Sequence, residues 1–519
     1  MSTARGARLV AAGILLSRIA GLVRQKALAF FLGDSAAADA LASAFRIPNM
    51  LQNLLGEGVL SASFIPAYAR LRSEGRAEEA GRLAGAVVAL LALVSSVVVL
   101  LGVLAAPLLV DLIAPGFGEA PRALTIRLVR VIFPGVGLLV LSAWCLGVLN
   151  AHRRFFLSYV SPVLWNAAMI VAVLVGAPGR GLDDIAVVVA LASVAGSVLQ
   201  FAVQLPMVLR LEPGLRFRPG FGDAALRGVI ARFGTTIVGR GVVQLSGFVD
   251  TAIASLVGSG AVAILGYSQT LSLLPISLFG MAVSAAELPA MAGETGEPEA
   301  VASALRTRLD RGLDRIAYFV VPTVVAFVLV GELVVYGLFG GGAFTADTAR
   351  WVHRTLIGAA LGLLANTAGR LYASALYALG DAVSPFRGAL LRVGLGGVLG
   401  WIGALGLPAW IGVDARWGLQ ALTAAAGVAA WVEYHWLRHR VTRAIGPTAV
   451  PTRRLLGYWA VAAVSVIGGL LVSVGGALLT RGSAVVIPGW VYAAITSAVA
   501  AGMYFALTAR FGIDDARRA

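Results

Sequence analysis

Charged and polar side chains interrupt the first two apolar stretches of the chain. Arg18 and Arg24 lie in the first stretch, and Asp39, Arg46 and Asn49 lie in the second. A charge near the middle of a membrane helix costs roughly 2.5–3.5 kcal/mol on insertion scales, so several together indicate a functional role. Their chemistry suits a water-filled cavity for a charged or polar cargo, because guanidinium groups hold anionic oxygens through paired hydrogen bonds.

The first stretch predicts a helix with one face of small residues. Gly13, Ser17 and Gly21 are spaced four apart, which allows a neighbouring helix to approach closely. Arg24 continues this face, while Arg18 projects about a third of a turn or more to the side. Together with Arg46 of the second stretch, we therefore expect three guanidinium groups to reach one cavity.

The second stretch predicts a helix with a polar stripe. Asp39 and Arg46 fall close to one line at the 3.6-residue period, Asn49 lies at its margin, and Pro48 should bend the helix. The alternative is that the basic side chains extend to the membrane interface and pair with Asp39.

Composition indicates a membrane protein. The 519 residues are 59% hydrophobic and 13% charged, with a mean hydropathy of +0.88. A single cysteine, Cys145, excludes an intramolecular disulfide and a cysteine-built metal site. We expect no cofactor, and coupling to an ion or to the membrane potential stays open.

Apolar runs of roughly 20 residues predict an all-α, polytopic membrane protein with about fourteen transmembrane helices. We expect them near 9–32, 38–68, 84–114, 123–150, 156–177, 184–209, 227–257, 261–292, 315–339, 351–378, 386–407, 417–437, 455–480 and 487–511.

The distribution of charge predicts the orientation of these helices. The net charge is +15, and the basic residues gather in alternate short loops, for example at Arg153, Arg210 and Arg443. The opposite loops hold isolated cations such as Arg180 and Arg416. This pattern is the positive-inside rule rather than a nucleic-acid surface, so we expect both termini in the cytoplasm.

An internal repeat predicts the domain organisation. The sequence LLGEGVLSASFIPAYA at 54–69 parallels LFGMAVSAAELPAMA at 278–292. The repeat predicts an N-terminal lobe over 1–230 (helices 1–6) and a C-terminal lobe over 231–450 (helices 7–12), with the cargo site between them. Residues 451–519 lie outside the repeat and hold helices 13 and 14 and a cytoplasmic tail.

Four motifs carry a resemblance to a known family. They are S-R-x-x-G-x-x-R at 17–24, A-F-R-I-P-N at 44–49, E-G-x-x-S-x-x-F-x-P at 57–66 and Y-A-L-G-D-A-V-S-P at 377–385. The chain resembles, over essentially its whole length, the MurJ/MviN lipid II flippases of the multidrug/oligosaccharidyl-lipid/polysaccharide exporter superfamily.

The resemblance implies a transporter of peptidoglycan biosynthesis in the bacterial inner membrane rather than an enzyme. Its cargo would be undecaprenyl-pyrophosphate-linked disaccharide-pentapeptide, moved from the cytoplasmic to the outer leaflet by alternating access. Membrane lipids and other cell-wall synthesis proteins are the further partners that it implies, and nucleic acid is not among them.

The resemblance also implies roles for individual residues. Arg18, Arg24 and Arg46 would contact the diphosphate, and Asp39 would hold them in place or take part in ion coupling. Asn49 would support the sugar or the helix bend. Arg370, on the tenth expected helix, would face the cavity; the alternative is an arginine packed near a helix end.

The chain departs from the family pattern at two places. Gln52 and Asn53 stand where the family has a basic pair, and Gln269 and Thr270 stand where it has an acidic residue followed by arginine. These departures bear on the substrate more than on the fold.

Three other functions compete with this interpretation. A flippase for another polyprenyl-pyrophosphate-linked glycan would use the same mechanism. An ion-coupled exporter of cationic drugs would need more carboxylates than arginines, which is the reverse of the first two stretches. A membrane-embedded glycosyltransferase would need a large outer loop, whereas the loops at 178–184 and 340–350 are short.

Overall fold

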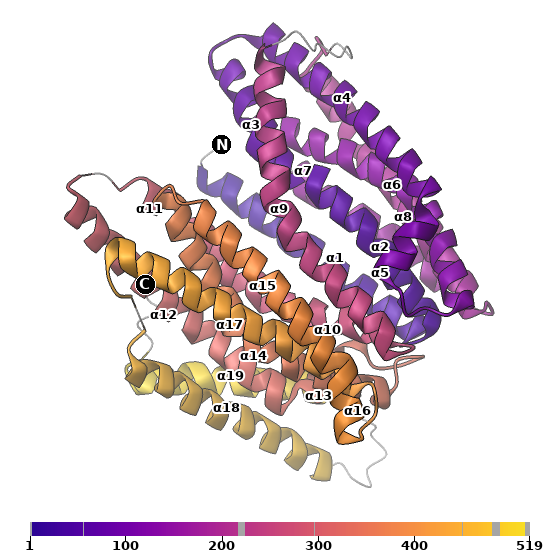
Figure 1. Cartoon of the computed structure of the whole chain (residues 1–519), viewed down its shortest axis with the longest axis vertical. Coiled ribbons are helices and arrows are strands. Elements are labelled where there is room, and N and C mark those ends of the chain that lie inside the picture. The colour runs from indigo at the N-terminus through magenta and orange to yellow at the C-terminus, as the bar shows by residue number, and fades with distance from the viewer. Residues whose placement is uncertain are drawn as a thin grey trace. The chain divides into compact units, whose positions relative to one another are not determined.

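The computed structural model describes residues 3–55, 57–215, 224–294, 296–448, 450–479 and 488–513. In these residues the secondary structure is helical, apart from a single bridge between Gly341 and Phe344 (Figure 1). The all-α fold class is therefore confirmed. The chain divides into two compact units, unit 1 (residues 1–252) and unit 2 (residues 253–519), and their boundary lies inside one helix, α9.

Unit 1 contains eight complete helices and most of a ninth. They are α1 (Thr3–Leu32), α2 (Ala36–Leu55), α3 (Glu57–Ser73), α4 (Ala77–Leu104), α5 (Ala106–Ile113), α6 (Glu119–Ala151), α7 (Phe155–Gly176), α8 (Leu182–Leu211) and α9 (Ala224–Val257).

Unit 2 contains the remaining helices and two π-helical turns. They are α10 (Ala261–Pro275), η1 (Ile276–Met281), α11 (Ala282–Ala292), α12 (Pro298–Leu329), α13 (Gly331–Phe339), α14 (Ala346–Ala378), α15 (Val383–Trp401), η2 (Ile402–Gly406), α16 (Leu407–Ile411), α17 (Trp417–Ile445), α18 (Thr452–Leu479) and α19 (Gly489–Arg510).

Each of the fourteen expected spans coincides with one helix or with consecutive helical segments. Nine helices among the described residues are long and apolar enough to cross a membrane. The expected span 84–114 is divided into α4 and α5, where Pro107 in the first turn of α5 lacks the backbone N–H that a continuous helix needs. The expected span 261–292 stays helical but widens into η1 directly after Pro275.

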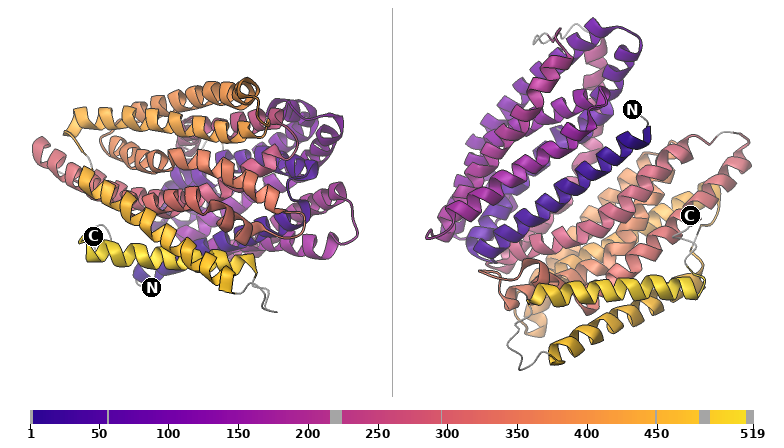
Figure 2. Two further views of the ribbon diagram at one scale, coloured as in Figure 1. Left: turned by 90° about the horizontal axis from the view of Figure 1, so that it is seen from below. Right: turned by 180° about the vertical axis from the view of Figure 1, so that it is seen from behind.

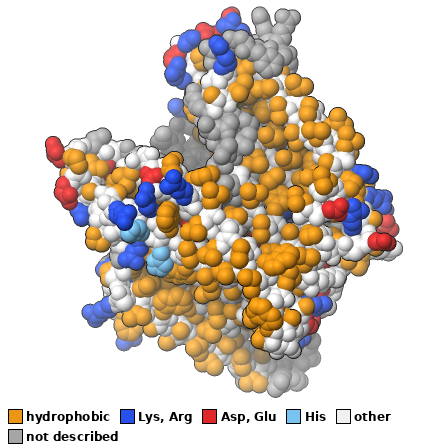
Figure 3. Space-filling view, viewed as in Figure 1, with side chains coloured by type: hydrophobic (Ala, Val, Ile, Leu, Met, Phe, Trp, Pro, Cys, Tyr) orange, Lys and Arg blue, Asp and Glu red, His pale blue; other side chains and the backbone are white. Residues whose placement is uncertain are grey.

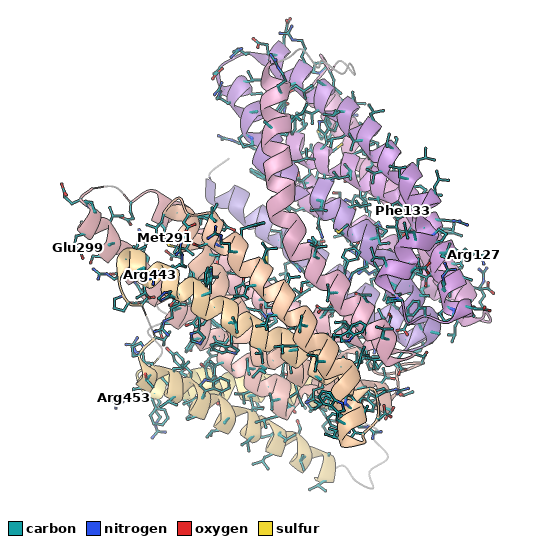
Figure 4. The ribbon with its side chains drawn as sticks, viewed as in Figure 1. Arg127, Phe133, Met291, Glu299, Arg443 and Arg453 are labelled. Atoms are coloured by element: carbon teal, nitrogen blue, oxygen red, sulfur yellow. The ribbon has the colours of Figure 1, made fainter. Side chains whose placement is uncertain are left out.

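Hydrophobic side chains cover most of the visible face of each unit, and most of the basic side chains lie toward its margins (Figure 3). In unit 1 the outward residues of α4 include Leu100, Leu101 and Leu104, each more than half exposed. In unit 2, Arg443 and Arg453 lie at the same end as Glu299 (Figure 4). Apolar sides and charged ends are what a bilayer requires of a helical protein.

Small residues hold the helices of unit 1 close together around α7. A Cβ atom at Gly13 of α1 would lie 2.6 Å from Tyr159, and one at Gly196 of α8 would lie 2.9 Å from the Cα atom of Trp165. The close approach expected at Gly13 is confirmed, whereas Gly21 has open space beside it. The helices α1 and α8 therefore both pack closely on α7, and this packing restricts the positions of the α7 side chains between them.

Within unit 2, buried hydrogen bonds tie the last two helices to α12. Asp314 of α12 accepts a hydrogen bond from the Tyr458 hydroxyl at 2.9 Å and one from Arg454 Nη1 at 3.2 Å, both on α18. The Tyr504 hydroxyl of α19 donates to the backbone carbonyl of Tyr318 at 2.8 Å. The helices α18 and α19 lie side by side and pack on α12 and α13 (Figure 2).

Candidate functional site

A polar cavity of about 530 Å³ lies inside unit 1, among α1, α2, α6, α7 and α8. Its polar and aromatic lining residues are Ser17, Arg18, Arg24, Asn49, Gln52, Ser142, Tyr159, Trp165, Asn166 and Gln200. The lining includes two arginines and no carboxylate.

The two arginines of α1 have no carboxylate partner within the described residues. The Cζ atom of Arg24 lies 4.9 Å from the centre of the Trp165 ring, and Arg24 Nε is buried without a hydrogen-bond acceptor. Arg18 is exposed to the cavity. Guanidinium groups in this state are available to an anion, since their donors are not already used by aspartate or glutamate.

Trp165 holds Arg24 without neutralising it. Its indole Nε1 donates to the backbone carbonyl of Ser193 at 3.0 Å, and the Phe45 ring meets it edge-on at 6.2 Å. A cation over an indole face gains roughly 0.5–2 kcal/mol. The ring therefore positions the guanidinium while its charge stays available.

The structure brings Asn49 to the cavity but places Asp39 and Arg46 elsewhere in unit 1. Arg46 Nε donates to Gly247 O at 3.2 Å and to Thr251 Oγ1 at 3.0 Å, both on α9. Asp39 is buried in the first turn of α2. The cavity face of α2 is formed by Asn49 and Gln52, and neither Asp39 nor Arg46 lines the cavity.

Arg370 lies in unit 2, on α14. It interacts electrostatically with Arg392 and Glu433, which pair with each other across α15 and α17 at 3.2 Å. The Thr270 hydroxyl on α10 donates a hydrogen bond to Gly266 O at 2.9 Å, so its proton is used within its own helix.

Similarity to known proteins shows the family of this chain. A family model described as "Lipid II flippase MurJ" matches residues 28–489. The chain belongs to the MurJ lipid II flippase family. The resemblance noted in the sequence is thus confirmed, although Arg18 and Arg24 precede the matched range.

Named members of the MurJ family are similar over most of their length. The Burkholderia cenocepacia protein "Lipid II flippase MurJ" is 31% identical over 412 residues, which covers 77% of this chain and 79% of that protein. The Rhizobium meliloti "Probable lipid II flippase MurJ" is 28% identical over 522 residues, and the match covers 92% of this chain and 95% of that protein.

Solved structures show the same fold. "Lipid II flippase MurJ, inward closed conformation" superposes with a TM-score of 0.79 at 20% identity and covers 98% of this chain and 99% of that one. An inward-facing multidrug resistance MATE family transporter gives a TM-score of 0.67 at 18% identity. This match covers 82% of this chain and 95% of that one. At these identities the likeness concerns the fold alone.

In this MurJ-family chain, sequence reasoning missed the part of the cavity wall that α6, α7 and α8 provide. Ser142, Trp165, Asn166 and Gln200 line the cavity from these helices. The available signal was a polar residue inside an otherwise apolar span, and in α8 a pair of glutamines, Gln200 and Gln204, one turn apart.

A second buried charge in unit 1 lies outside the cavity. Glu212, at the end of α8, accepts hydrogen bonds from Tyr68 and Arg72 of α3, and His152 Nε2 lies 3.0 Å from its Oε1. Burial lowers the pKa of His152 and outweighs the opposing attraction of Glu212. This cluster joins the ends of α3, α6 and α8. Among the described residues, no group of three His, Cys, Asp or Glu side chains is placed to hold a metal ion.

Proposed function

We propose that this MurJ-family chain moves lipid II, the polyprenyl-diphosphate-linked peptidoglycan precursor, from the cytoplasmic to the outer leaflet of the inner membrane by alternating access. The observation that supports this most strongly is the pair Arg18 and Arg24, which line a polar cavity between apolar helices without a carboxylate partner. A diphosphate supplies the anionic oxygens that such guanidinium groups bind.

The size of the cavity supports a head-group site. Cavities of 300–1,000 Å³ are usual for small-molecule ligands, and this one is about 530 Å³. It accommodates a diphosphate with an adjoining sugar, while a long polyprenyl chain must lie outside it. We propose that α18 and α19 carry that chain on their apolar outer faces, where Leu471 and Leu478 are more than half exposed.

The charge of the cavity disfavours export of cationic drugs. Such a cargo needs a carboxylate to replace its hydration, and the residues that line this cavity include none. The similarity to MATE transporters gives the fold and leaves the cargo open. A flippase for a related diphosphate-linked glycan is the rival that the cavity does not disfavour.

The basic residues at one end of unit 2 support an orientation in the membrane. Arg443 and Arg453, from loops that the positive-inside rule assigns to the cytoplasm, lie at one end of unit 2 (Figure 4). We propose that this end and both chain termini face the cytoplasm. We also propose that the lobes predicted from the repeat, 1–230 and 231–450, rock against each other to expose the cavity alternately.

Depletion of the protein in its native host tests the function. Lipid extraction should show accumulation of lipid II, and a copy with Arg24→Ala should fail to reverse it. Arg127→Ala is the matched control, because Arg127 is exposed on α6 and is not among the cavity-lining residues. Accumulation of a different lipid-linked glycan would assign the chain to the rival substrate.

A further inference from the structure

The cavity wall that α7 and α8 provide presents hydrogen-bond acceptors. Two side-chain amides, Asn166 of α7 and Gln200 of α8, line the cavity and are more than nine-tenths buried. An amide offers both a donor group and an acceptor oxygen, so what this wall can bind depends on how each amide is turned. Their protein partners determine the orientation of both.

Asn166 is oriented by the backbone of its own helix. Its Nδ2 donates to Pro162 O at 3.0 Å, and its Oδ1 is buried without a hydrogen-bond partner in the described residues. A carbonyl oxygen accepts and cannot donate, so the amide nitrogen must be the atom that faces Pro162. The oxygen of Asn166 is therefore an unfilled acceptor.

Gln200 is oriented by a directional chain of four buried hydrogen bonds. The Ser161 hydroxyl donates to Ser158 O at 3.2 Å, so Ser161 Oγ must accept from Gln204 Nε2. Gln204 Oε1 then accepts from the Ser142 hydroxyl at 2.9 Å, and Ser142 Oγ accepts from Gln200 Nε2 at 2.9 Å. Because each hydroxyl has one proton to donate, all four hydrogen bonds point in the same direction, from Gln200 toward Ser158.

This series of hydrogen bonds ends at Gln200 Oε1, an acceptor that no protein group fills. With Nε2 of Gln200 bound to Ser142, its Oε1 accepts no hydrogen bond from the described residues. Helix–helix adhesion explains why Ser142, Gln204 and Ser161 bond to one another. It does not explain why the oxygens of two oriented amides stay without a protein donor, and the buried oxygen of Asn166 in this state destabilises the fold.

We propose that Asn166 and Gln200 form a second subsite, which accepts hydrogen bonds from hydroxyl or amide N–H groups of the cargo beside the anion site on α1. This inference rests on the proposed function and deepens it. The arginines hold the diphosphate, and the two amide oxygens recognise the sugar attached to it. The cavity thereby distinguishes a glycosylated polyprenyl diphosphate from the bare one.

Binding of two purified lipids to the full chain in lipid nanodiscs tests the subsite. The probes are undecaprenyl diphosphate and undecaprenyl diphosphate that carries an N-acetylated hexose, and their dissociation constants are compared. We expect the unmodified protein to prefer the glycosylated lipid. Gln200→Leu should lower this preference roughly threefold to tenfold, the range for one neutral hydrogen bond, without changing affinity for the bare diphosphate.

A serine pair on α7 provides a variant and its matched control. Ser161→Ala removes the acceptor that orients Gln204, so we expect it to weaken the sugar preference although Ser161 is not among the cavity-lining residues. Ser158→Ala removes a buried hydroxyl one turn away and leaves the Ser158 carbonyl in place. This control should keep the preference of the unmodified protein.

The outcomes separate this inference from the proposed function. If the unmodified protein binds neither lipid, the proposed function is wrong and the subsite falls with it. If it binds both, and Gln200→Leu and Ser161→Ala keep the same ratio of affinities, the second subsite alone is wrong. Unchanged affinity for the bare diphosphate shows that each variant is folded.

Discussion

Arginines have opposite surroundings in the cavity of unit 1 and in the ion pairs of unit 2. In unit 2, Arg454 meets Asp314 at 3.2 Å and Arg392 meets Glu433 at 3.2 Å, so each charge is neutralised where it lies. In the cavity, Arg24 meets the face of Trp165, and none of the cavity-lining residues carries a carboxylate. The comparison teaches that pairing indicates a structural role, whereas an unpaired cation that is held in position is available to a ligand.

The two kinds of arginine should respond differently to substitution. Removing one member of a buried ion pair leaves the other charge uncompensated and destabilises the fold. Removing an unpaired cation from a membrane helix relieves an insertion cost and leaves the fold intact. Stability and transport, measured side by side, therefore test the comparison directly.

The largest effect is expected at the cavity arginines. Arg18→Ala and Arg24→Ala should each abolish lipid II transport, because the diphosphate loses a charge-assisted contact inside the cavity. Lysine at either position should restore transport only in part, since it lacks the planar fork. Growth with the variant as the only copy measures the effect, and thermal unfolding should stay unchanged. Normal growth of both alanine variants would exclude the diphosphate role.

The reverse pattern is expected at the anchor of the last two helices. Asp314→Ala removes the acceptor for Tyr458 and Arg454 and should lower the free energy of unfolding by about 2–3 kcal/mol. This figure is below the value for a fully buried pair, because the Arg454 side chain is 38% exposed. A lower midpoint of thermal unfolding checks it, with Glu332→Ala of α13 as control. An unchanged midpoint would mean that apolar packing alone holds α18 and α19.

A smaller effect is expected at Arg370, the cation that the family resemblance assigns to the cavity. Arg370→Ala should lower transport here more than in relatives that keep an arginine at the position of Thr270, since in those relatives a second cation still attracts the anion. Adding Thr270→Arg should restore part of the activity, because α10 and α14 pack together in unit 2. Normal transport by Arg370→Ala would leave the anion to the arginines of unit 1.

The helices of both units could be predicted from the sequence because of the bilayer itself. Backbone groups in hydrocarbon must bond within their own helix, so apolar length alone indicates each span. The positions of helix breaks are harder to predict from the sequence. Pro107 lies where α4 gives way to α5, whereas Pro48 and Pro66 lie inside α2 and α3 without ending them. What decides between these outcomes is the packing of neighbouring helices.

The cavity could be predicted only in part. Charges inside an apolar stretch indicate Arg18 and Arg24, and both line the cavity. The helical period puts Asn49 at the margin of the polar stripe of α2, yet Asn49 lines the cavity, whereas Arg46 binds α9. Gln200 and Asn166 each look like one polar residue in an apolar span, and their meaning depends on partners one or more helices away. Tertiary contacts, which a single sequence does not display, decide whether such a residue joins helices or faces a ligand.

The smallest effect is expected at the buried charge of unit 1 that has protein partners. Burial lowers the pKa of His152 beside Glu212, so the folded protein holds this ring neutral where the unfolded chain, with a pKa near 6.5, already binds a proton. The unfolded state then binds more protons, and stability is lost as the pH falls from about 6.5 toward the folded-state pKa. We expect the midpoint of thermal unfolding to fall over this range, and His152→Asn to reduce the fall. Because His152 is not among the cavity-lining residues, the sugar preference of lipid binding should not change with this variant, and a change would contradict the separation of the Glu212 cluster from the cavity.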